Sequence, residues 1–435
     1  MSLEHGRTYI DSAHNKREYE SKTENAFNRV RFKAPKKTDY MFENASDTIV
    51  LSLEYREVMD SDSIVSSRGG HTHLGSYSMK ETKENEPPTI YVPGTAPKYT
   101  KRDFDKDGSL KLLPDTGLHF MDEHAERFPK QQYVPMFRAL AVTNPSFRFN
   151  EIHIVVNRTV LMNMILFIKG ASSLQPFHLE LDMEQNTLFI GRKVRNAKSS
   201  FGTDPDKPSF GHNLEAALTT KDPELEDSTS YHRFLMYQLG HLNIVIRYEV
   251  DAYMAESEVP QDSDAVPCHY PEHVSDAIPA EVIDPQAPPA TVVIAKGTPI
   301  KQHQLVEMKS GKSSRPLEQM WFGRTPNCVT GKPLKEVTPE GVRYGVYTHR
   351  ITKTQFVTQS GEKDFEDWEQ QNQPWLRKLV WLLQKLRDTV ETTKDRSAIF
   401  VALNEKDNKR FTMYETKERV GALPRELVER FWNKE

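Results

Sequence analysis

The chain has 435 residues, of which 37% are hydrophobic and 28% are charged, as is typical of a soluble globular protein with some disordered length. Its 58 lysines and arginines against 62 aspartates and glutamates give a net charge of −4, which excludes a global basic field for nonspecific nucleic-acid binding. A nucleic-acid substrate would therefore be gripped locally, for instance at an end. The two cysteines, Cys268 and Cys328, exclude a disulfide framework and favour a reducing compartment, the nucleus or the cytoplasm.

Residues 1–88 are polar, rich in lysine, glutamate, serine and asparagine, and weakly periodic. This composition predicts a mostly disordered extension with one short ordered piece at 48–58. The basic run at 29–37 is interpreted as a solvated tail, with nuclear import or RNA contact as alternatives. The N-terminus lacks the apolar core of a signal peptide, and no run is long enough to span a bilayer, so we expect no membrane contact.

From residue 89 onward the pattern is a mixture of strands and helices, and we expect a single domain over 89–435. The predicted elements are a strand at 151–157, a helix at 159–169, a hairpin at 177–190, a helix at 212–219 and strands at 231–237 and 242–251. Residues 256–298 are acidic, rich in proline and without periodicity, which predicts a surface loop or a disordered insertion.

The elements predicted after the insertion are a strand at 305–309, a helix at 315–324, strands around 342–347, a helix at 375–390 and a closing hairpin at 397–415. Pro374 would begin the helix at 375–390, at a position where a missing N–H is harmless. The fold class is therefore predicted as α+β, a mixed α/β fold with helices flanking mixed sheets.

Charged motifs end two of the apolar strands. In the strand at 242–251 side chains alternate between two faces, so Glu249 and Asp251 project side by side. In the strand at 305–309, Glu307 and Lys309 share a face. If the two strands pair, three carboxylates and one ammonium group meet on one patch, which repels itself unless a divalent cation such as Mg²⁺ or Mn²⁺ lies within it.

This layout is typical of a metal-dependent phosphodiester hydrolase. Either motif alone is more often ordinary charge on the exposed face of a strand, whereas the two together leave both interpretations open. Two other motifs lack an essential member. The run 103–108 imitates a calcium loop but has Pro114 where a glutamate is needed, and Gly311-Lys312-Ser313 lacks the first glycine of a phosphate loop.

Three further elements surround the two strands. Glu215 lies one helical turn after Gly211, Gln319 follows the second strand on a predicted helix, and Arg158 lies where a strand passes into a helix. At such a junction a guanidinium and the helix N-terminal amides can hold a phosphate together. Each residue taken singly is more often an ordinary surface side chain.

In chain order, Arg158, Gly211-X-X-X-Glu215, Glu249-X-Asp251, Glu307-X-Lys309 and Gln319 resemble the motifs of the DXO family of decapping and 5′→3′ exoribonucleases. These enzymes are related to the nuclear partner of a major 5′→3′ exoribonuclease. The resemblance covers roughly residues 90–420 and includes the hairpin at 179–190 and Leu239-Gly240. It implies two mixed sheets flanked by helices around a restriction-nuclease-like core related to the PD-(D/E)XK fold.

The resemblance also implies a role for each residue. Metal ligands would be Glu215, Asp251, Glu307 and the backbone carbonyl of Met308, with Glu249 binding a metal directly or through water. Lys309 and Gln319 would position the attacking water and the scissile phosphate, and Arg158 would hold a substrate phosphate. The chemistry would be hydrolysis by two Mg²⁺ or Mn²⁺ ions about 3.5–4 Å apart.

The chain departs from the family pattern beside these residues. His212 stands where an aromatic or larger apolar residue is usual, Ser310-Gly311 replaces Thr-Ser, and Asn157-Arg158-Thr159 replaces Trp-Arg-Gly. No departure removes a metal ligand, so we predict a hydrolase of RNA 5′ ends. The sequence does not indicate which 5′ end it prefers. The alternatives are a restriction-like DNA nuclease, and a catalytically weak scaffold partner of a 5′→3′ exoribonuclease.

Overall fold

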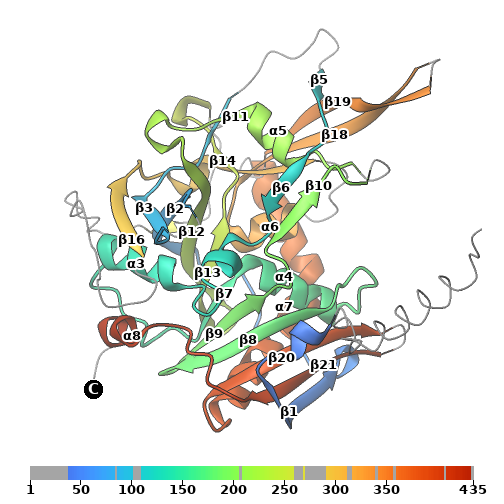
Figure 1. Ribbon diagram of the computed structural model, residues 1–435. Helices are drawn as coiled ribbons and strands as arrows, with labels where there is room; N and C mark the ends of the chain where they lie inside the picture. The colour runs from blue at the N-terminus through green and yellow to red at the C-terminus, as the bar shows by residue number, and fades with distance from the viewer. Residues whose placement is uncertain are drawn as a thin grey trace, which may run out of the picture. The chain divides into compact units, whose positions relative to one another are not determined.

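The computed structural model of the chain (Figure 1) describes residues 38–432 except 84–85, 101–108, 205–207, 259–267, 270–290, 311–315, 339–340, 356–358 and 406–407. The chain divides into two compact units, Met1–Glu43 and Asn44–Glu435. The described part of the first is a short 3-10 helix, η1 (Asp39–Phe42). The predicted tail at 29–37 lies outside the described residues.

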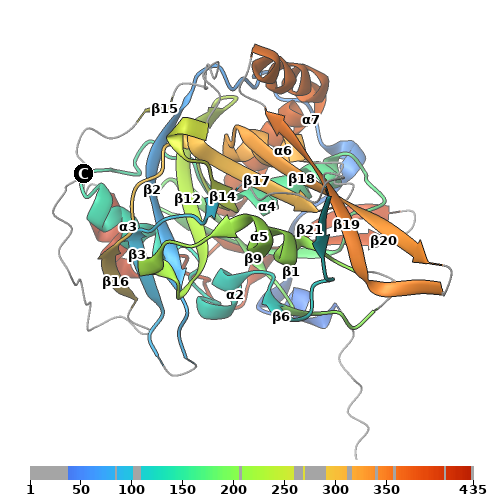
Figure 2. The same cartoon turned by 90° about the horizontal axis from the view of Figure 1, so that it is seen from above.

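The second unit is built on a large mixed sheet of twelve described strands (Figures 1 and 2). In spatial order these are β1 (Ala45–Glu54), β21 (Asn408–Thr416), β20 (Ser397–Glu405), β8 (Phe177–Glu184), β9 (Thr187–Lys193), β7 (Ile154–Asn157), β13 (Leu242–Glu249), β12 (Ser228–Leu239), β2 (His71–Lys80), β3 (Thr89–Pro93) and β16 (Val292–Lys296), with β15 (Cys268–His269) beside β2. β7 is parallel to both β13 and β9, whereas most other neighbours are antiparallel.

A second mixed sheet has seven described strands. Their order is β11 (Thr219–Thr220), β4 (Lys98–Tyr99), β14 (Ala252–Tyr253), β17 (Leu305–Ser310), β18 (Asn327–Thr338), β19 (Gly341–Gln355) and β5 (Ser109–Leu112). A small sheet pairs β6 (Gly117–Phe120) with β10 (Lys198–Phe201). In both views the β18–β19 ribbon projects away from the rest of its sheet (Figures 1 and 2).

Helices cover both faces of the large sheet. The described helices are α2 (Glu123–Arg127), α3 (Val134–Thr143), α4 (Arg158–Ile168), α5 (Gly211–Leu218), α6 (Pro316–Gly323), α7 (Gln359–Glu391) and α8 (Arg425–Phe431), with 3-10 turns η2 (Tyr55–Glu57), η3 (Pro223–Leu225), η4 (Glu256–Glu258) and η5 (Gln302–Gln304). Helices α4, α6 and α7 share one hydrophobic cluster with the sheet, and α3 and α8 share another.

Strand β13 shows why the sheet is buried on both sides. Its residues Ile244 and Ile246 lie in the cluster of α4, α6 and α7, whereas Val245, between them, lies in the cluster of α3 and α8. Alternate side chains of a strand point to opposite faces, so an uninterrupted apolar run suits a sheet that is covered twice. The predicted mixed fold with helices flanking mixed sheets is confirmed.

The domain begins earlier than predicted. Strands β1 and β2 precede residue 89 and belong to the large sheet. The ordered piece predicted at 48–58 is confirmed as part of β1 and η2, whereas the prediction of disorder is wrong for β2. β2 looks polar in the sequence, yet Ser76 and Ser78 are buried. Ser76 Oγ donates to the carbonyl of Pro93 at 2.9 Å, a partner from the neighbouring strand that composition does not reveal.

Helix α7 begins at Gln359, so Pro374 lies inside it and not at its start. The half of the helix before Pro374 is held by tertiary contacts. Trp368 packs against Trp321 of α6 at 5.3 Å between ring centroids, and Glu369 accepts hydrogen bonds from Trp321 Nε1 at 3.1 Å and from Ser67 N at 2.8 Å. These contacts offset the backbone bond that the proline removes.

Part of the predicted insertion forms strands. Within 256–298, β15 pairs with the inner strand β2, and β16 pairs with β3 and extends the large sheet at its edge. The loop prediction is wrong for these two strands, whereas 259–267 and 270–290 lie outside the described residues. The hairpins predicted at 177–190 and 397–415 are confirmed as β8–β9 and β20–β21.

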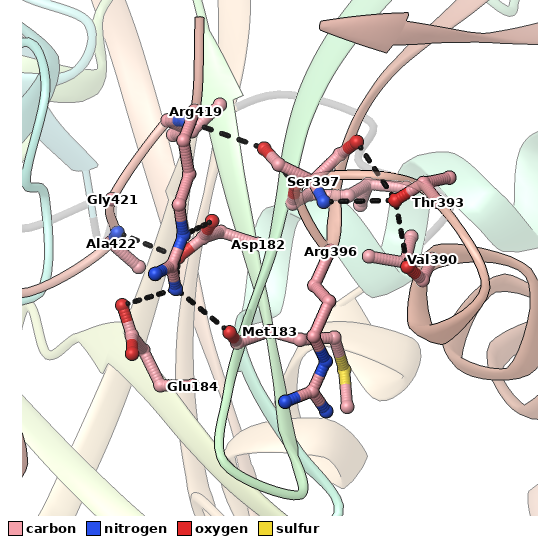
Figure 3. A network of polar contacts seen from close by, with 12 residues as sticks. Asp182, Met183, Glu184, Val390, Thr393, Arg396, Ser397, Arg419, Gly421 and Ala422 are labelled. Atoms are coloured by element: carbon pink, nitrogen blue, oxygen red, sulfur yellow. Dashed lines mark hydrogen bonds and ion pairs between the residues drawn. The ribbon is translucent and has the colours of Figure 1, made fainter.

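A buried carboxylate pair ties the segment after β21 to β8 (Figure 3). Asp182, which is 1% exposed, accepts hydrogen bonds from Arg419 Nε at 3.1 Å and Ala422 N at 3.0 Å. Arg419 Nη2 also lies 2.9 Å from Glu184 Oε1. Burial and the neighbouring Asp182 charge raise the pKa of Glu184 to about 7, against the opposing effect of Arg419.

This raised pKa predicts a pH-dependent stability. Because the pKa of Glu184 is higher in the folded state than its ordinary value, its contribution is fully present below pH 4.5 and is lost as pH rises through 7. Replacing it in Glu184→Gln should remove that loss. Urea unfolding measures the free energy of unfolding of both proteins. The difference between variant and wild type should shift in favour of the variant by about 2 kcal/mol between pH 5 and pH 8. Parallel pH profiles for the two proteins would contradict the assignment.

Candidate active site

The candidate site lies where the two sheets meet. β13 ends at Glu249, Asp251 follows in the turn, and the chain enters β14, which pairs with β17 through Ala252 and Val306. The two motif strands do not pair directly, because β13 and β17 belong to different sheets. The motifs still meet, since Asp251 Oδ2 accepts a hydrogen bond of 2.6 Å from Met308 N.

Glu307 is the most deeply buried of the predicted site residues, at 1% exposure. Its Oε2 accepts a hydrogen bond of 2.8 Å from Arg158 Nη1, and its Oε1 contacts Lys309 Nζ. Lys309 Nζ also lies 3.7 Å from Asp251 Oδ2. A single carboxylate therefore holds both cations of the cluster.

Arg158 is buried beneath the carboxylates, at 6% exposure. It is the first residue of α4, directly after β7, and its Nη2 donates to the carbonyl of Glu249 at 3.3 Å. Its guanidinium lies 5.2 Å from the ring centroid of Tyr248. In this arrangement Arg158 orients Glu307 and the end of β13, and its role in holding a substrate phosphate remains a prediction.

Glu215 joins the cluster from α5, one turn after Gly211. Burial, followed by the charges of Asp251 and Glu249, raises its pKa well above the ordinary value. Helix α5 is anchored by the buried Asp115, whose carboxylate accepts from Asn213 N at 2.8 Å and from His212 N at 3.3 Å. This anchor fixes the direction in which Glu215 leaves the helix.

The pKa values of Glu249 and Asp251 are raised as well, whereas the pKa of Glu307 is lowered. Glu249 keeps contact with solvent, yet the surrounding protein and the Asp251 charge raise its pKa to about 8. Burial and the Glu307 charge raise the pKa of Asp251 to about 6. Burial also acts to raise the pKa of Glu307, but Arg158 and Lys309 outweigh it and lower that pKa. For Lys309 the charges of Glu307 and Asp251 outweigh burial and raise its pKa.

The cluster therefore carries an excess of negative charge. Four carboxylates face two cations, and the raised pKa values show that the protein compensates them incompletely. An all-oxygen donor set of this kind fits Mg²⁺ or Mn²⁺. Among the described residues, no three acidic, histidine or cysteine side chains surround one point closely enough to hold an ion as they stand. Binding would therefore require the carboxylates to move together.

Two predicted residues contribute differently. Gln319 is half-buried on α6 and, among the described residues, makes no hydrogen bond or ion pair with the cluster. Met308 contributes its backbone N–H to Asp251, and its side chain is buried against α5 and β14. The roles of Gln319 and of the Met308 carbonyl remain predictions.

A second polar group beside Glu249, the side chain of His232, was not predicted from the sequence. His232 on β12 is paired with Glu249 on β13, and its Nε2 bonds to Ser230 Oγ at 2.9 Å. Ser230 Oγ in turn donates to Glu123 Oε2 on α2 at 2.5 Å. Only the alternation of β12, combined with its register against β13, could have indicated this neighbour.

Comparison with known proteins places the chain in a family. Residues 48–432 match the family described as "Domain of unknown function (DUF8563)". The chain belongs to this family. No curated protein sequence matches this DUF8563 chain. Similar solved structures exist, and they are named Rai1 or Dxo1, the group of proteins that the motifs resemble.

Three of these structures come from yeasts. Candida albicans Rai1 has a TM-score of 0.48 and 12% identity, covering 87% of this chain and 98% of its own. S. pombe Rai1 has a TM-score of 0.46 and 11% identity, covering 84% of this chain and 98% of its own. K. lactis Dxo1 has a TM-score of 0.45 and 10% identity over 85% and 98%.

The buried ion pair predicts a large effect on stability. Arg158→Met leaves Glu307 buried with Lys309 alone, and breaking such a pair should lower the free energy of unfolding by about 3 kcal/mol. Arg425→Met is the matched control, because Arg425 pairs with Glu429 at 3.0 Å while its side chain is 91% exposed. Chemical denaturation should show a change below about 0.5 kcal/mol for the control. Equal effects of the two substitutions would contradict the structural role of Arg158.

Proposed function

We propose that this chain is a divalent-metal-dependent hydrolase that acts at the 5′ ends of RNA. It would release pyrophosphate, an incomplete cap or an NAD cap, with 5′→3′ degradation as an accompanying activity. The observation that carries the proposal is the meeting of Glu215, Glu249, Asp251, Glu307 and Lys309 from α5, β13, the turn after it and β17.

The residues divide the work by charge. Glu215, Asp251 and Glu307 would hold Mg²⁺ or Mn²⁺, which supplies Lewis acidity toward a phosphoryl oxygen and an activated water. Lys309 places a fixed positive charge at the cluster, where negative charge accumulates on a pentacoordinate phosphate. Arg158 orients Glu307 by donating to its Oε2. The other oxygen of Glu307 contacts Lys309 Nζ, which also lies near Asp251 Oδ2. Gln319 would assist in placing the substrate.

The choice of an RNA end as substrate rests on charge and motif order. A chain of net charge −4 lacks the long basic surface that grips a nucleic acid along its length, so contact at one end is favoured. The ordered motifs resemble those of enzymes that act at RNA 5′ ends. The structure of Candida albicans Rai1 holds pU5 and Mn²⁺, and those of S. pombe and Scheffersomyces stipitis Rai1 hold 3′-FADP and (3′-NADP)⁺ with calcium. These ligands guide the choice of test substrates.

The test is an end-group assay on RNAs of one sequence that carry a 5′-triphosphate, a cap, an NAD cap or a monophosphate. We expect Mg²⁺- or Mn²⁺-dependent release from at least one of them. Asp251→Ala and Glu307→Ala should lower kcat/KM by at least about a hundredfold, because each removes a charge at the reacting phosphate. The control Glu256→Ala removes an exposed carboxylate that contacts Lys301 and His303. Release that is unaffected by either site variant would refute the proposal.

Metal binding gives a second prediction that needs no substrate. Calorimetric titration with Mn²⁺ should show binding that is weakened at least about tenfold in Asp251→Asn, because the substitution removes one negative oxygen donor and leaves the shape unchanged. Glu256→Gln should bind Mn²⁺ as wild type does. Heat of binding that is the same in all three proteins would place the metal elsewhere.

The scaffold alternative is favoured by one observation, the engagement of Glu307 by both cations in the described arrangement. It predicts no heat with Mn²⁺ or Mg²⁺ and stable co-purification with a 5′→3′ exoribonuclease. The two experiments above therefore separate an enzyme from a partner protein.

A further inference from the structure

The side chain of His232 is a close cross-strand neighbour of Glu249. The two residues are paired in the antiparallel β12–β13 ladder, so they project from the same face. The adjacent pair is hydrogen-bonded, since Val250 N donates to Tyr231 O at 3.0 Å. Hydrogen-bonded and non-hydrogen-bonded pairs alternate, so His232 and Glu249 form the second kind, in which Cα atoms approach to about 4.5 Å.

A chain of hydrogen bonds fixes the tautomer of His232. The Glu123 carboxylate accepts from Ser230 Oγ at 2.5 Å, Thr229 Oγ1 at 2.6 Å and Arg127 Nε at 2.8 Å. Ser230 has a single hydroxyl proton and gives it to Glu123, so its oxygen can only accept from His232 Nε2 at 2.9 Å. His232 therefore carries its proton on Nε2, and its Nδ1 has a lone pair.

The orientation of the ring is fixed as well. The ring of His124 meets that of His232 edge-on at 4.4 Å between centroids. On the other side of β12, Tyr77 of β2 is paired with His232, and the two ring centroids are 5.3 Å apart. His124 is itself held by a hydrogen bond of 2.6 Å between its Nε2 and Tyr77 Oη. Burial, with the charges of Arg247 and Arg158, holds the pKa of His232 well below its usual range, so the ring stays neutral.

The remaining nitrogen, Nδ1, is an acceptor beside the candidate active site. It bonds to no described residue, and solvent reaches it although the residue as a whole is only 6% exposed. A buried chain that starts at a salt-bridged glutamate and ends in a preoriented acceptor next to Glu249 is a costly arrangement for packing alone. It suits the placement of a small hydrogen-bond donor at the end of β13.

We propose that His232 is a positioning residue of the hydrolase, and that its Nδ1 accepts a hydrogen bond from the attacking water beside Glu249. The inference rests on the proposed function and adds to it a residue outside the resemblance to the DXO family. His232 aligns the water through its lone pair and takes no proton from it. Ser230 and Glu123 act through His232 by keeping the proton on Nε2.

Two amide substitutions separate the two ring nitrogens. His232→Gln keeps a donor near the Nε2 position for Ser230 and loses the acceptor at Nδ1, whereas His232→Asn keeps an oxygen acceptor near Nδ1. We expect His232→Gln to lower kcat roughly tenfold or more with KM within about twofold, and His232→Asn to recover most of that loss. The control is His241→Gln, at the exposed turn of the same hairpin.

A second measurement needs no activity. Histidine-selective ¹⁵N NMR of the full chain, with the His232 signals assigned by their loss in His232→Gln, should show the proton on Nε2. Ser230→Ala should release that preference, because no other described residue bonds to Nε2.

The outcomes separate the inference from the proposed function. If the wild-type protein is active and His232→Gln is equally fast, the role of His232 is overturned and the proposed function is not. The same holds if His232→Asn is as slow as His232→Gln. A proton on Nδ1 overturns it as well. Wild-type protein that hydrolyses none of the RNA ends overturns the proposed function, and the role of His232 in it falls too.

Discussion

The buried carboxylate of Glu307 is the point on which both sheets depend. Placing a charge at 1% exposure requires partners, because an unpaired buried ion is strongly unfavourable. The partners come from opposite sides: Arg158 from the junction of β7 and α4 in the large sheet, and Lys309 from β17 itself. Arg158 also holds the carbonyl of Glu249. One ion pair therefore fixes the end of β13 relative to β17, and with it the spacing of the two motifs.

The same pairing leaves the rest of the cluster undercompensated. Both cations are directed to Glu307, so Glu215, Glu249 and Asp251 have little neutralising charge of their own, and their pKa values rise. Neighbouring carboxylates whose pKa values are raised by burial and by one another are more typical of functional sites than of structural ion pairs, in which opposite charges compensate each other. The rigid surroundings make the arrangement possible, since Asp115 anchors α5 and Met308 N anchors Asp251.

The sequence predicted those parts of the site that local pattern controls. Alternation on 242–251 placed Glu249 and Asp251 beyond a buried strand, and a carboxylate one turn after Gly211 identified Glu215. Whether β13 and β17 pair could not be decided from the sequence, because the two-residue strand β14, which pairs with β17 in place of β13, is too short to leave a pattern. The series of hydrogen bonds from Glu123 through Ser230 to His232 was not predicted, for a related reason. It joins α2 to β12 across about a hundred residues, and only the register of three strands brings His232 beside Glu249.

The departure from the family pattern at His212 has a structural explanation. The ring of His212 stacks on His119 of β6 at 3.9 Å and 8° between planes, and Phe201 of β10 meets both rings edge-on. Since Glu215 follows His212 by three residues on α5, this stack lies on the same helix face as the carboxylate. The neighbours of His212 thus come from β6 and β10, segments that carry none of the motifs. Variation of β6 and β10 would leave Glu307 and its partners, which hold the carboxylate cluster, unchanged.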